Sequence, residues 1–111
     1  MDLTCTTFRA VANSANGSLN NETEMRFTSD DGIVIGNYSG GTIVTGQVLA
    51  TRLGESELEM LYQGATAGGV IQAGRAHATF ATGDDDRLHM YLNWQWLTGD
   101  RSEGKSEWVM V

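Results

Sequence analysis

The sequence predicts an all-β fold, an antiparallel up-and-down barrel of about eight strands, formed by one domain that spans residues 1–111. Fourteen glycines and no proline occur in the chain, and many of the glycines stand beside Asn, Asp, Ser or Thr, as turns require. Between these turns lie eight segments rich in Thr, Val, Ile and aromatic residues. Because no apolar stripe with the period of a helix is left to cover their apolar face, the strands must close on themselves.

The expected strands, in chain order, are residues 3–15, 18–29, 33–39, 42–52, 55–64, 70–81, 87–97 and 105–111. The connections between them are short, so strands that are neighbours in sequence should pair antiparallel. The interior of a barrel of this size either is filled by side chains or holds one small ligand.

The turns also predict a pairing register. Asn16-Gly17, Asp31-Gly32, Gly40-Gly41 and Leu53-Gly54 each fit a two-residue hairpin loop. With longer loops at 65–69 and 82–86, the predicted cross-strand pairs are Thr6 with Phe27, Phe8 with Met25, Met25 with Tyr38, Tyr38 with Ile43, Leu49 with Leu58, Thr45 with Tyr62, Tyr62 with Gln72, Gly74 with Trp94, and Phe80 with Leu88.

This register separates the side chains into an apolar and a charged face, as a barrel wall requires. The predicted inward side chains are Phe8, Leu19, Met25, Phe27, Val34, Ile43, Leu49, Leu58, Met60, Phe80, Leu88, Met90, Leu92, Trp94 and Trp96. The predicted outward side chains are Arg9, Glu22, Glu24, Arg26, Arg52, Glu57, Glu59, Arg75 and His89.

The two ends of the predicted barrel differ in polarity. One end is apolar, whereas the inward side chains near the other mix aromatic rings with hydrogen-bonding groups: Asn21, Tyr38, Thr45, Tyr62, Gln72, Trp94 and Trp96. Such a mixture is typical of a small-ligand site, in which the tryptophans stack on an organic ligand and the polar groups orient it. Alternatively, Trp94 and Trp96 only fill the volume left by Gly74 and small neighbours, with Gln72 accepting an indole N–H under either interpretation.

Net charge and motifs limit the partners, metals and cellular location that we expect. A net charge of −7 disfavours nucleic acid as a partner. His77 and His89 lack a second ligand at zinc spacing, and Asp84-Asp85-Asp86 lacks the spacing of a calcium loop, so we expect no metal and no cofactor. With a single cysteine, Cys5, no leader-like N-terminus and no membrane-length apolar run, we expect a cytoplasmic protein.

Three functions are candidates: binding of a small ligand, self-association of a filled barrel, and catalysis. Catalysis has the least support. A general base would have to come from Asp100, beside Arg101, in the loop after Trp96, and an exposed turn pair explains both residues as well. The expected partner is a small organic ligand. The alternative is a side-chain-filled barrel that acts by self-association, with further copies of the chain as its partners.

Over nearly its whole length the chain resembles a family of small bacterial proteins sometimes labelled N-acetylglutamate synthase. The matching residues are Thr7-Phe8-Arg9, Asn16-Gly17, Tyr38 with Gly40-Gly41, and the run WQWLTGDRSEGKS at 94–106. The label implies an acetyl-CoA-dependent enzyme, which needs a glycine-bearing turn that opens a helix. The sequence offers neither, so we do not expect that activity.

The run QWLTG at 95–99, followed by Trp108, is similar to the C-terminal part of avidin and streptavidin. This resemblance implies a streptavidin-like or lipocalin-like barrel, with ligand contacts from Trp96, Thr98 and Trp108. The chain lacks that family's N-terminal Trp-Tyr-Asn segment and its final acidic ligand contact. We therefore expect the fold but not biotin as the ligand.

Overall fold

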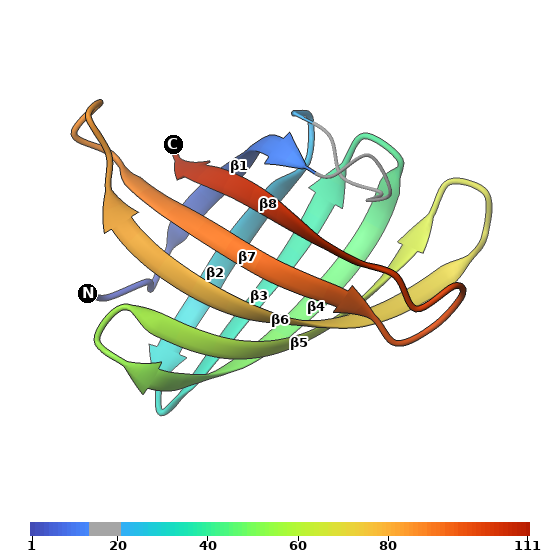
Figure 1. Ribbon diagram of the computed structural model, residues 1–111, viewed down its shortest axis with the longest axis horizontal. Coiled ribbons are helices and arrows are strands. Elements are labelled where there is room, and N and C mark those ends of the chain that lie inside the picture. Colours follow the sequence, from blue (N-terminus) through green and yellow to red (C-terminus); the bar gives the residue numbers. More distant parts are fainter. Residues whose placement is uncertain (14–20) are drawn as a thin grey trace.

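The computed structural model describes residues 1–13 and 21–111, which form a closed antiparallel barrel (Figure 1). Its strands are β1 (Thr6–Asn13), β2 (Glu24–Asp31), β3 (Ile33–Gly40), β4 (Ile43–Gly54), β5 (Glu57–Thr66), β6 (Ile71–Thr82), β7 (Leu88–Trp96) and β8 (Glu103–Met110). Each strand pairs with the next, and β8 pairs with β1 to close the barrel. The predicted eight-stranded meander barrel is therefore confirmed. No helix long and apolar enough to cross a membrane occurs in the two described ranges.

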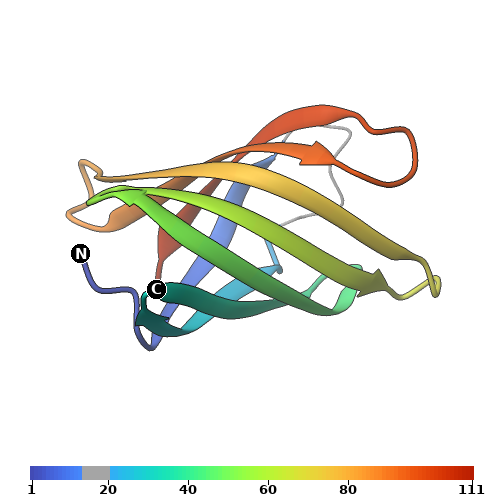
Figure 2. The ribbon, with the colours of Figure 1, turned by 90° about the horizontal axis from the view of Figure 1, so that it is seen from below.

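Turns alternate between the two ends of the barrel (Figures 1 and 2). The β3–β4, β5–β6 and β7–β8 turns lie at one end, which we call the mouth. The β2–β3, β4–β5 and β6–β7 turns lie at the opposite end, together with both chain termini. The predicted hairpin turn at Asn16-Gly17 falls outside the described residues.

The predicted register of the first three strands is correct. Phe8 pairs with Met25, Thr6 with Phe27, and Met25 with Tyr38. The apolar members of these pairs are all buried, because side chains alternate between the two faces of a strand and one face is turned inward.

The predicted register of β4 is wrong. Gly40 pairs with Ile43, so the turn consists of Gly41 and Thr42, and irregularities on both strands then place Tyr38 opposite Gly46 instead of Ile43. This shift of three residues exchanges the faces of most of β4. As a result Thr45 and Leu49 point outward, and Val48 and Ala50 occupy the interior.

A second irregularity, between Arg52 and Gly54, restores the predicted faces from β5 onward. The remaining predicted pairs are wrong in detail, because the turns lie one or two residues further along the chain than the sequence predicts. The observed pairs are Leu49 with Leu61, Thr45 with Ala65, Tyr62 with Gly74, Gly64 with Gln72, Gly74 with Trp96, Ala76 with Trp94, and Phe80 with Met90. The pairs between β5, β6 and β7 shift by two residues, which preserves the inward face.

Most of the predicted core is confirmed. Apart from Asn21, Thr45 and Leu49, which are exposed, every predicted inward residue in the described ranges is buried or half-buried. The predicted inward positions of these three residues are therefore wrong. Leu19 lies outside those ranges. On the predicted outward face Arg52 and His89 are partly buried, because each forms ion pairs with neighbouring carboxylates.

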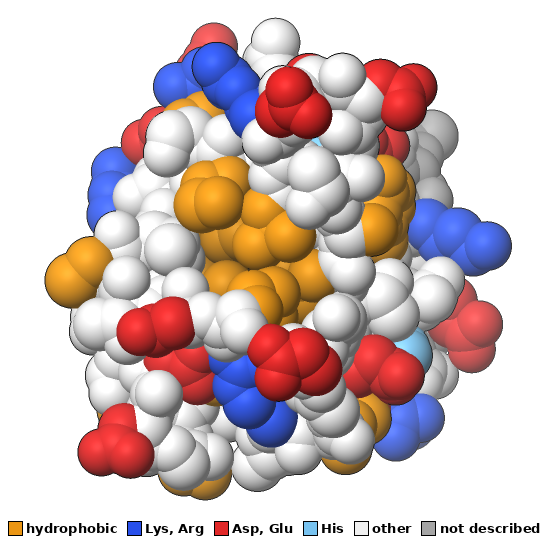
Figure 3. All heavy atoms as spheres, turned by 90° about the vertical axis from the view of Figure 1, so that its left-hand side faces the viewer, with side chains coloured by type: hydrophobic (Ala, Val, Ile, Leu, Met, Phe, Trp, Pro, Cys, Tyr) orange, Lys and Arg blue, Asp and Glu red, His pale blue; other side chains and the backbone are white. Residues whose placement is uncertain are grey.

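The segment before β1 covers the end opposite the mouth. The sequence predicts a strand from residue 3, whereas β1 begins at Thr6. Leu3 is fully buried in the core, and its backbone N–H donates to Asp30 Oδ2 at 2.8 Å. Arg52 binds the same carboxylate and also donates to the Met1 carbonyl. The bond from Arg52 lowers the pKa of Asp30, so the carboxylate stays charged and fixes the segment. Hydrophobic side chains gather at the centre of this end inside a charged rim (Figure 3).

The buried position of Leu3 predicts a large effect of truncation. We expect Leu3→Ala to lower the free energy of unfolding by about 2 to 5 kcal/mol, because it opens a cavity in the core. Leu53→Ala, at a position 58% exposed, is the matched control and should change that free energy by no more than about 0.5 kcal/mol. Urea titrations measure both values, and equal effects would show that the segment before β1 does not pack as described.

Candidate functional site

Four aromatic side chains meet inside the mouth. Tyr38 on β3 contacts Tyr62 on β5 edge to face, with ring centroids 6.1 Å apart. Tyr62 contacts Trp96 on β7 in the same way at 5.8 Å, and Trp96 lies 5.8 Å from Trp94. The edge-to-face geometry is the one that aromatic quadrupoles favour. The sequence-predicted convergence of these four residues is therefore observed.

Three of the four rings lie directly over inward glycines of neighbouring strands. A Cβ atom added at Gly46 would lie 2.3 Å from the Tyr38 ring, and one added at Gly104 would lie 2.3 Å from the Trp94 ring. A Cβ atom added at Gly74 would lie 2.6 Å from the Tyr62 ring. The barrel wall thus accommodates large rings where it has no side chain of its own. The glycine–aromatic packing differs from the predicted one, since Tyr62, rather than a tryptophan, covers Gly74.

Burial determines the chemical state of these groups. Burial raises the pKa of Tyr38 and Tyr62, so both phenols stay neutral. The indole N–H of Trp94 is buried and has no hydrogen-bond partner in the described part of the chain. Gln72, the acceptor that the sequence predicts, does not bind it, so this buried donor has no acceptor among residues 1–13 and 21–111.

A pocket of about 320 Å³ lies above this cluster, between the β5–β6 and β7–β8 loops. Its lining consists of Val70, Ile71, Gln72, Trp96, Thr98, Gly99 and Asp100. We call it the mouth pocket. It combines two apolar side chains, one indole and three hydrogen-bonding side chains, which is the composition of small-molecule sites.

Backbone contacts between β6 and the chain after β7 position the pocket. Leu97 N–H donates to the Ala73 carbonyl at 2.8 Å, and Ala73 N–H donates to Thr98 Oγ1 at 3.2 Å. Gly99 then turns the chain with a φ of 66°, a conformation that glycine adopts without strain. Asp100 accepts a hydrogen bond from Ser102 N–H, which lowers the pKa of Asp100 and keeps it ionised.

The remaining predicted site residues lie elsewhere. Thr45 is exposed on the outer face of β4, so its predicted inward position is wrong. Trp108 is fully buried beside Ala10 and Met90 in the half of the barrel away from the mouth, and its N–H donates to Ser106. Sequence reasoning missed Val70 and Ile71. Their adjacency directly after Gly68-Gly69, in a turn otherwise made of small residues, was the available sign.

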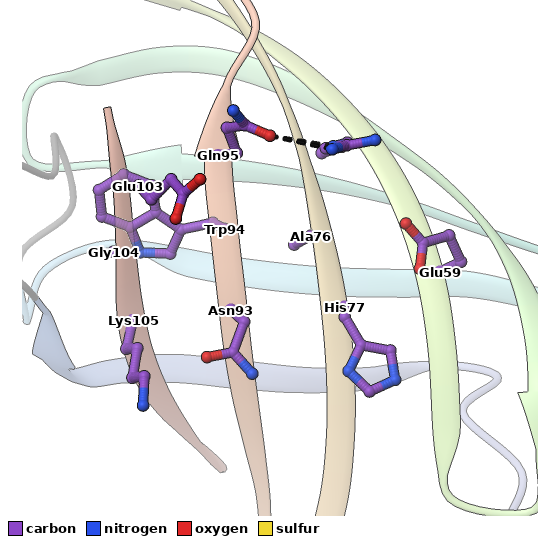
Figure 4. A pocket seen from close by; sticks show the side chains of 10 residues that line it. Glu59, Ala76, His77, Asn93, Trp94, Gln95, Glu103, Gly104 and Lys105 are labelled. Carbon is purple, nitrogen blue, oxygen red and sulfur yellow. Dashed lines mark hydrogen bonds between the residues drawn. The ribbon is translucent and has the colours of Figure 1, made fainter. Parts of the chain in front are cut away.

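A second hollow, of about 510 Å³, lies on the outer wall of β5 to β8 (Figure 4). Its outward side chains carry both signs of charge, among them Glu59, Arg75, Glu103 and Lys105. Gln95 Oε1 accepts from Arg75 at 3.0 Å, as the dashed line in the figure marks. This hollow is an open groove with solvated charges on the surface of the sheet, whereas the mouth pocket is more enclosed and lies between two loops, so the mouth pocket is the better candidate ligand site.

A third polar cluster surrounds His89 at the end opposite the mouth. Its Nδ1 lies 2.8 Å from Glu107 Oε2, and its Nε2 lies 2.9 Å from Asp85 Oδ1. Both contacts raise the pKa of His89, and the imidazolium form can donate both hydrogen bonds. This cluster joins the β6–β7 turn to β8. Among residues 1–13 and 21–111, no group of three or more ligating side chains is placed to hold a metal ion.

Fold and mouth together define a small closed β-barrel with an aromatic pocket at one end. The chain belongs to the avidin-like protein family, whose model matches residues 1–111. Barrels of this family often bind small ligands. No curated protein and no solved structure matches the chain. The resemblance to proteins labelled N-acetylglutamate synthase finds no support in these comparisons.

The packing of Trp94 on Gly104 predicts a strong response to one added methyl group. We expect Gly104→Ala to lower the free energy of unfolding by about 1 to 3 kcal/mol and to change the tryptophan emission, because the indole must move. Gly54→Ala is the control, since no atom lies within 4 Å of a Cβ placed there. Urea titration followed by fluorescence measures both effects. Similar stabilities of the two variants would contradict the packing.

The His89 cluster predicts a pH-dependent stability. Because the pKa of His89 is raised in the folded state above its usual 6.5, the imidazolium stabilises the fold fully below pH 6.5. That contribution is lost as the pH rises through the folded-state pKa. The stability difference between the natural chain and His89→Gln should therefore shrink with rising pH in urea titrations. In an Asp85→Asn, Glu107→Gln background the difference should not depend on pH; a difference that grows with pH would refute this assignment.

Proposed function

We propose that this avidin-like protein binds a small, partly apolar organic ligand in the mouth pocket. The observation that carries the proposal is the mixed lining of that pocket, in which the Trp96 indole is joined by apolar and hydrogen-bonding side chains from two loops. Family membership supports the same class of function, since related barrels often bind small ligands.

Each part of the pocket suits one part of such a ligand. The indole of Trp96, with Val70 and Ile71, offers apolar contact to a flat or aliphatic group. The Gln72 amide and the Thr98 hydroxyl hydrogen-bond to polar substituents, and the ionised Asp100 favours a ligand that presents a donor. The N–H of Trp94, next to Trp96, has no acceptor among the described residues and lies outside the pocket lining, so it favours an ordered water rather than the ligand.

The aromatic packing argues for a ligand at the mouth rather than deep in the barrel. Rings occupy the space in front of Gly46, Gly74 and Gly104, where a wider barrel would leave room. Trp96 and Thr98, which match the avidin-type run, line the pocket, whereas Trp108 lies away from it. We therefore propose a ligand other than biotin.

Two other functions fit the chain less well. A filled barrel that acts only by self-association is favoured by the same glycine–aromatic packing, and it leaves the mouth pocket without a role. Catalysis would need a general base, yet the hydrogen bond from Ser102 lowers the pKa of Asp100, which makes that carboxylate a weak base at neutral pH.

Native mass spectrometry of the protein purified from its own host tests the binding function. We expect a species heavier than the 12.0 kDa chain by the mass of one small molecule. Ile71→Glu should remove that species, because a charge enters the apolar wall of the pocket at a position 72% exposed, where folding is unaffected.

The matched control is Leu53→Glu, which adds the same charge at a position 58% exposed at the opposite end of the barrel. This variant should retain the heavier species. The proposal would be overturned if the natural protein showed only the mass of the chain, or if the Ile71→Glu variant kept the heavier species.

A further inference from the structure

We propose that the mouth pocket takes an organic cation, whose ammonium group lies beside Asp100 and whose apolar body contacts Val70 and Ile71. This inference rests on the binding function proposed above, and it names the chemical class of the ligand. Three features of the pocket favour a cation: its charged side chain, its indole, and the division of its lining between two loops.

The charge of the pocket is negative. Among the described residues, Asp100 is the only charged side chain that lines it. Ser102 N–H donates to Asp100 Oδ1 at 3.0 Å, which lowers the pKa of the carboxyl and keeps it ionised at neutral pH. A carboxylate has about four lone-pair sites, so it can accept further hydrogen bonds. In residues 1–13 and 21–111 no Lys, Arg or His forms an ion pair with it, so a ligand ammonium group would supply the counter-ion.

The same lining disfavours an anion. Arg101 is the only Lys or Arg in the described mouth turns, at 41–42, 67–70 and 97–102. It is exposed and does not line the pocket. An anionic ligand would therefore meet the Asp100 carboxylate with no cation beside it to offset the repulsion. The net charge of −7 also attracts cations to the surface of the protein and repels anions.

The Trp96 indole adds a second attraction for a positive charge. The face of an aromatic ring carries negative charge density, and tryptophan is the aromatic side chain that attracts ammonium groups most strongly. Trp96 lines the pocket but is only 9% exposed, so a ligand meets it at a largely desolvated surface, where such an attraction is stronger than in water. Ring contacts with Tyr62 and Trp94 hold the indole in place.

The apolar side of the pocket comes from a different loop. Val70 and Ile71, 56% and 72% exposed, belong to the β5–β6 turn and the start of β6, whereas Asp100 belongs to the β7–β8 turn. The hydrogen bond from Leu97 N–H to the Ala73 carbonyl, at 2.8 Å, joins these two parts of the chain. A ligand that covers both parts has an apolar body and a charged head. A glutamate at position 71 would face the apolar body rather than the ammonium group, which agrees with the loss of binding expected for Ile71→Glu.

NMR titration of the full chain with three small probes tests the inference. The probes are 2-phenylethylamine, 2-phenylethanol and 3-phenylpropionate, which share a phenyl ring on a short chain and are a cation, a neutral molecule and an anion at neutral pH. The amide signals of Ile71 and Gly99 report binding at the mouth pocket. At low ionic strength we expect the amine to bind at least about fivefold more tightly than the carboxylate, with the alcohol between them. Because Asp100 is exposed, added salt should reduce this preference.

Asp100→Asn removes the charge from the pocket and keeps an oxygen that can accept from Ser102 N–H. This variant should reduce the preference for the amine over the carboxylate by at least about twofold. Asp84→Asn is the matched control, since it removes the same charge from an exposed position in the β6–β7 turn, at the opposite end of the barrel. It should leave the preference within the error of the natural chain.

The possible failures separate this inference from the binding function. Equal affinities for the three probes, or tighter binding of the carboxylate, would overturn the cationic ligand and leave binding at the mouth pocket standing. An equal loss of preference in Asp84→Asn and Asp100→Asn would also overturn it, because the preference would then come from the net charge alone. If no probe changed the signals of Ile71 and Gly99, the cationic ligand and the proposed binding function would both be overturned.

Discussion

The structure depends on the close contact between large aromatic rings and inward-facing glycines at the mouth of the barrel. Tyr38, Tyr62 and Trp94 each lie over a glycine of a neighbouring strand, so near that a single Cβ atom would collide with the ring. An eight-stranded barrel has a narrow interior, and any side chain at those glycine positions would exclude the rings. The three glycines therefore determine where the rings lie. Because the rings fill the interior there, the free space lies above them at the mouth, against Trp96.

The two ends of the barrel consequently have different roles. At the end opposite the mouth, Leu3 fills the core and the Asp30–Arg52 ion pair fixes its segment, while the His89 cluster joins the β6–β7 turn to β8. At the mouth, hydrogen bonds between Ala73 and the chain after β7 hold an open pocket. Further apolar surface lies on the outer wall, where Ile35, Leu49 and Leu61 form a row across three strands.

Alternation of apolar and polar residues was sufficient to predict the barrel, the first hairpin pairs and the convergence of Tyr38, Tyr62, Trp94 and Trp96. It failed on β4, because that strand carries large apolar residues on both faces, with Val48 inside and Leu49 outside, so pattern alone cannot fix its register. The irregularities in the pairing of β4 depend on backbone geometry, which the residue pattern does not predict. Leu3 and Val70 lie outside the strands, and Ile71 is only the first residue of β6, so periodicity carries little information about these residues.

The most direct test of the glycine–aromatic packing is the proton NMR spectrum of the assigned protein. A glycine Hα that lies against the face of an aromatic ring experiences the ring current and moves strongly upfield. The structure predicts such shifts for Gly46, Gly74 and Gly104, with nuclear Overhauser effects to Tyr38, Tyr62 and Trp94, respectively, and no comparable shift for Gly54. Ordinary Hα shifts at the three inward glycines would show that the rings lie elsewhere and would contradict the account of the mouth.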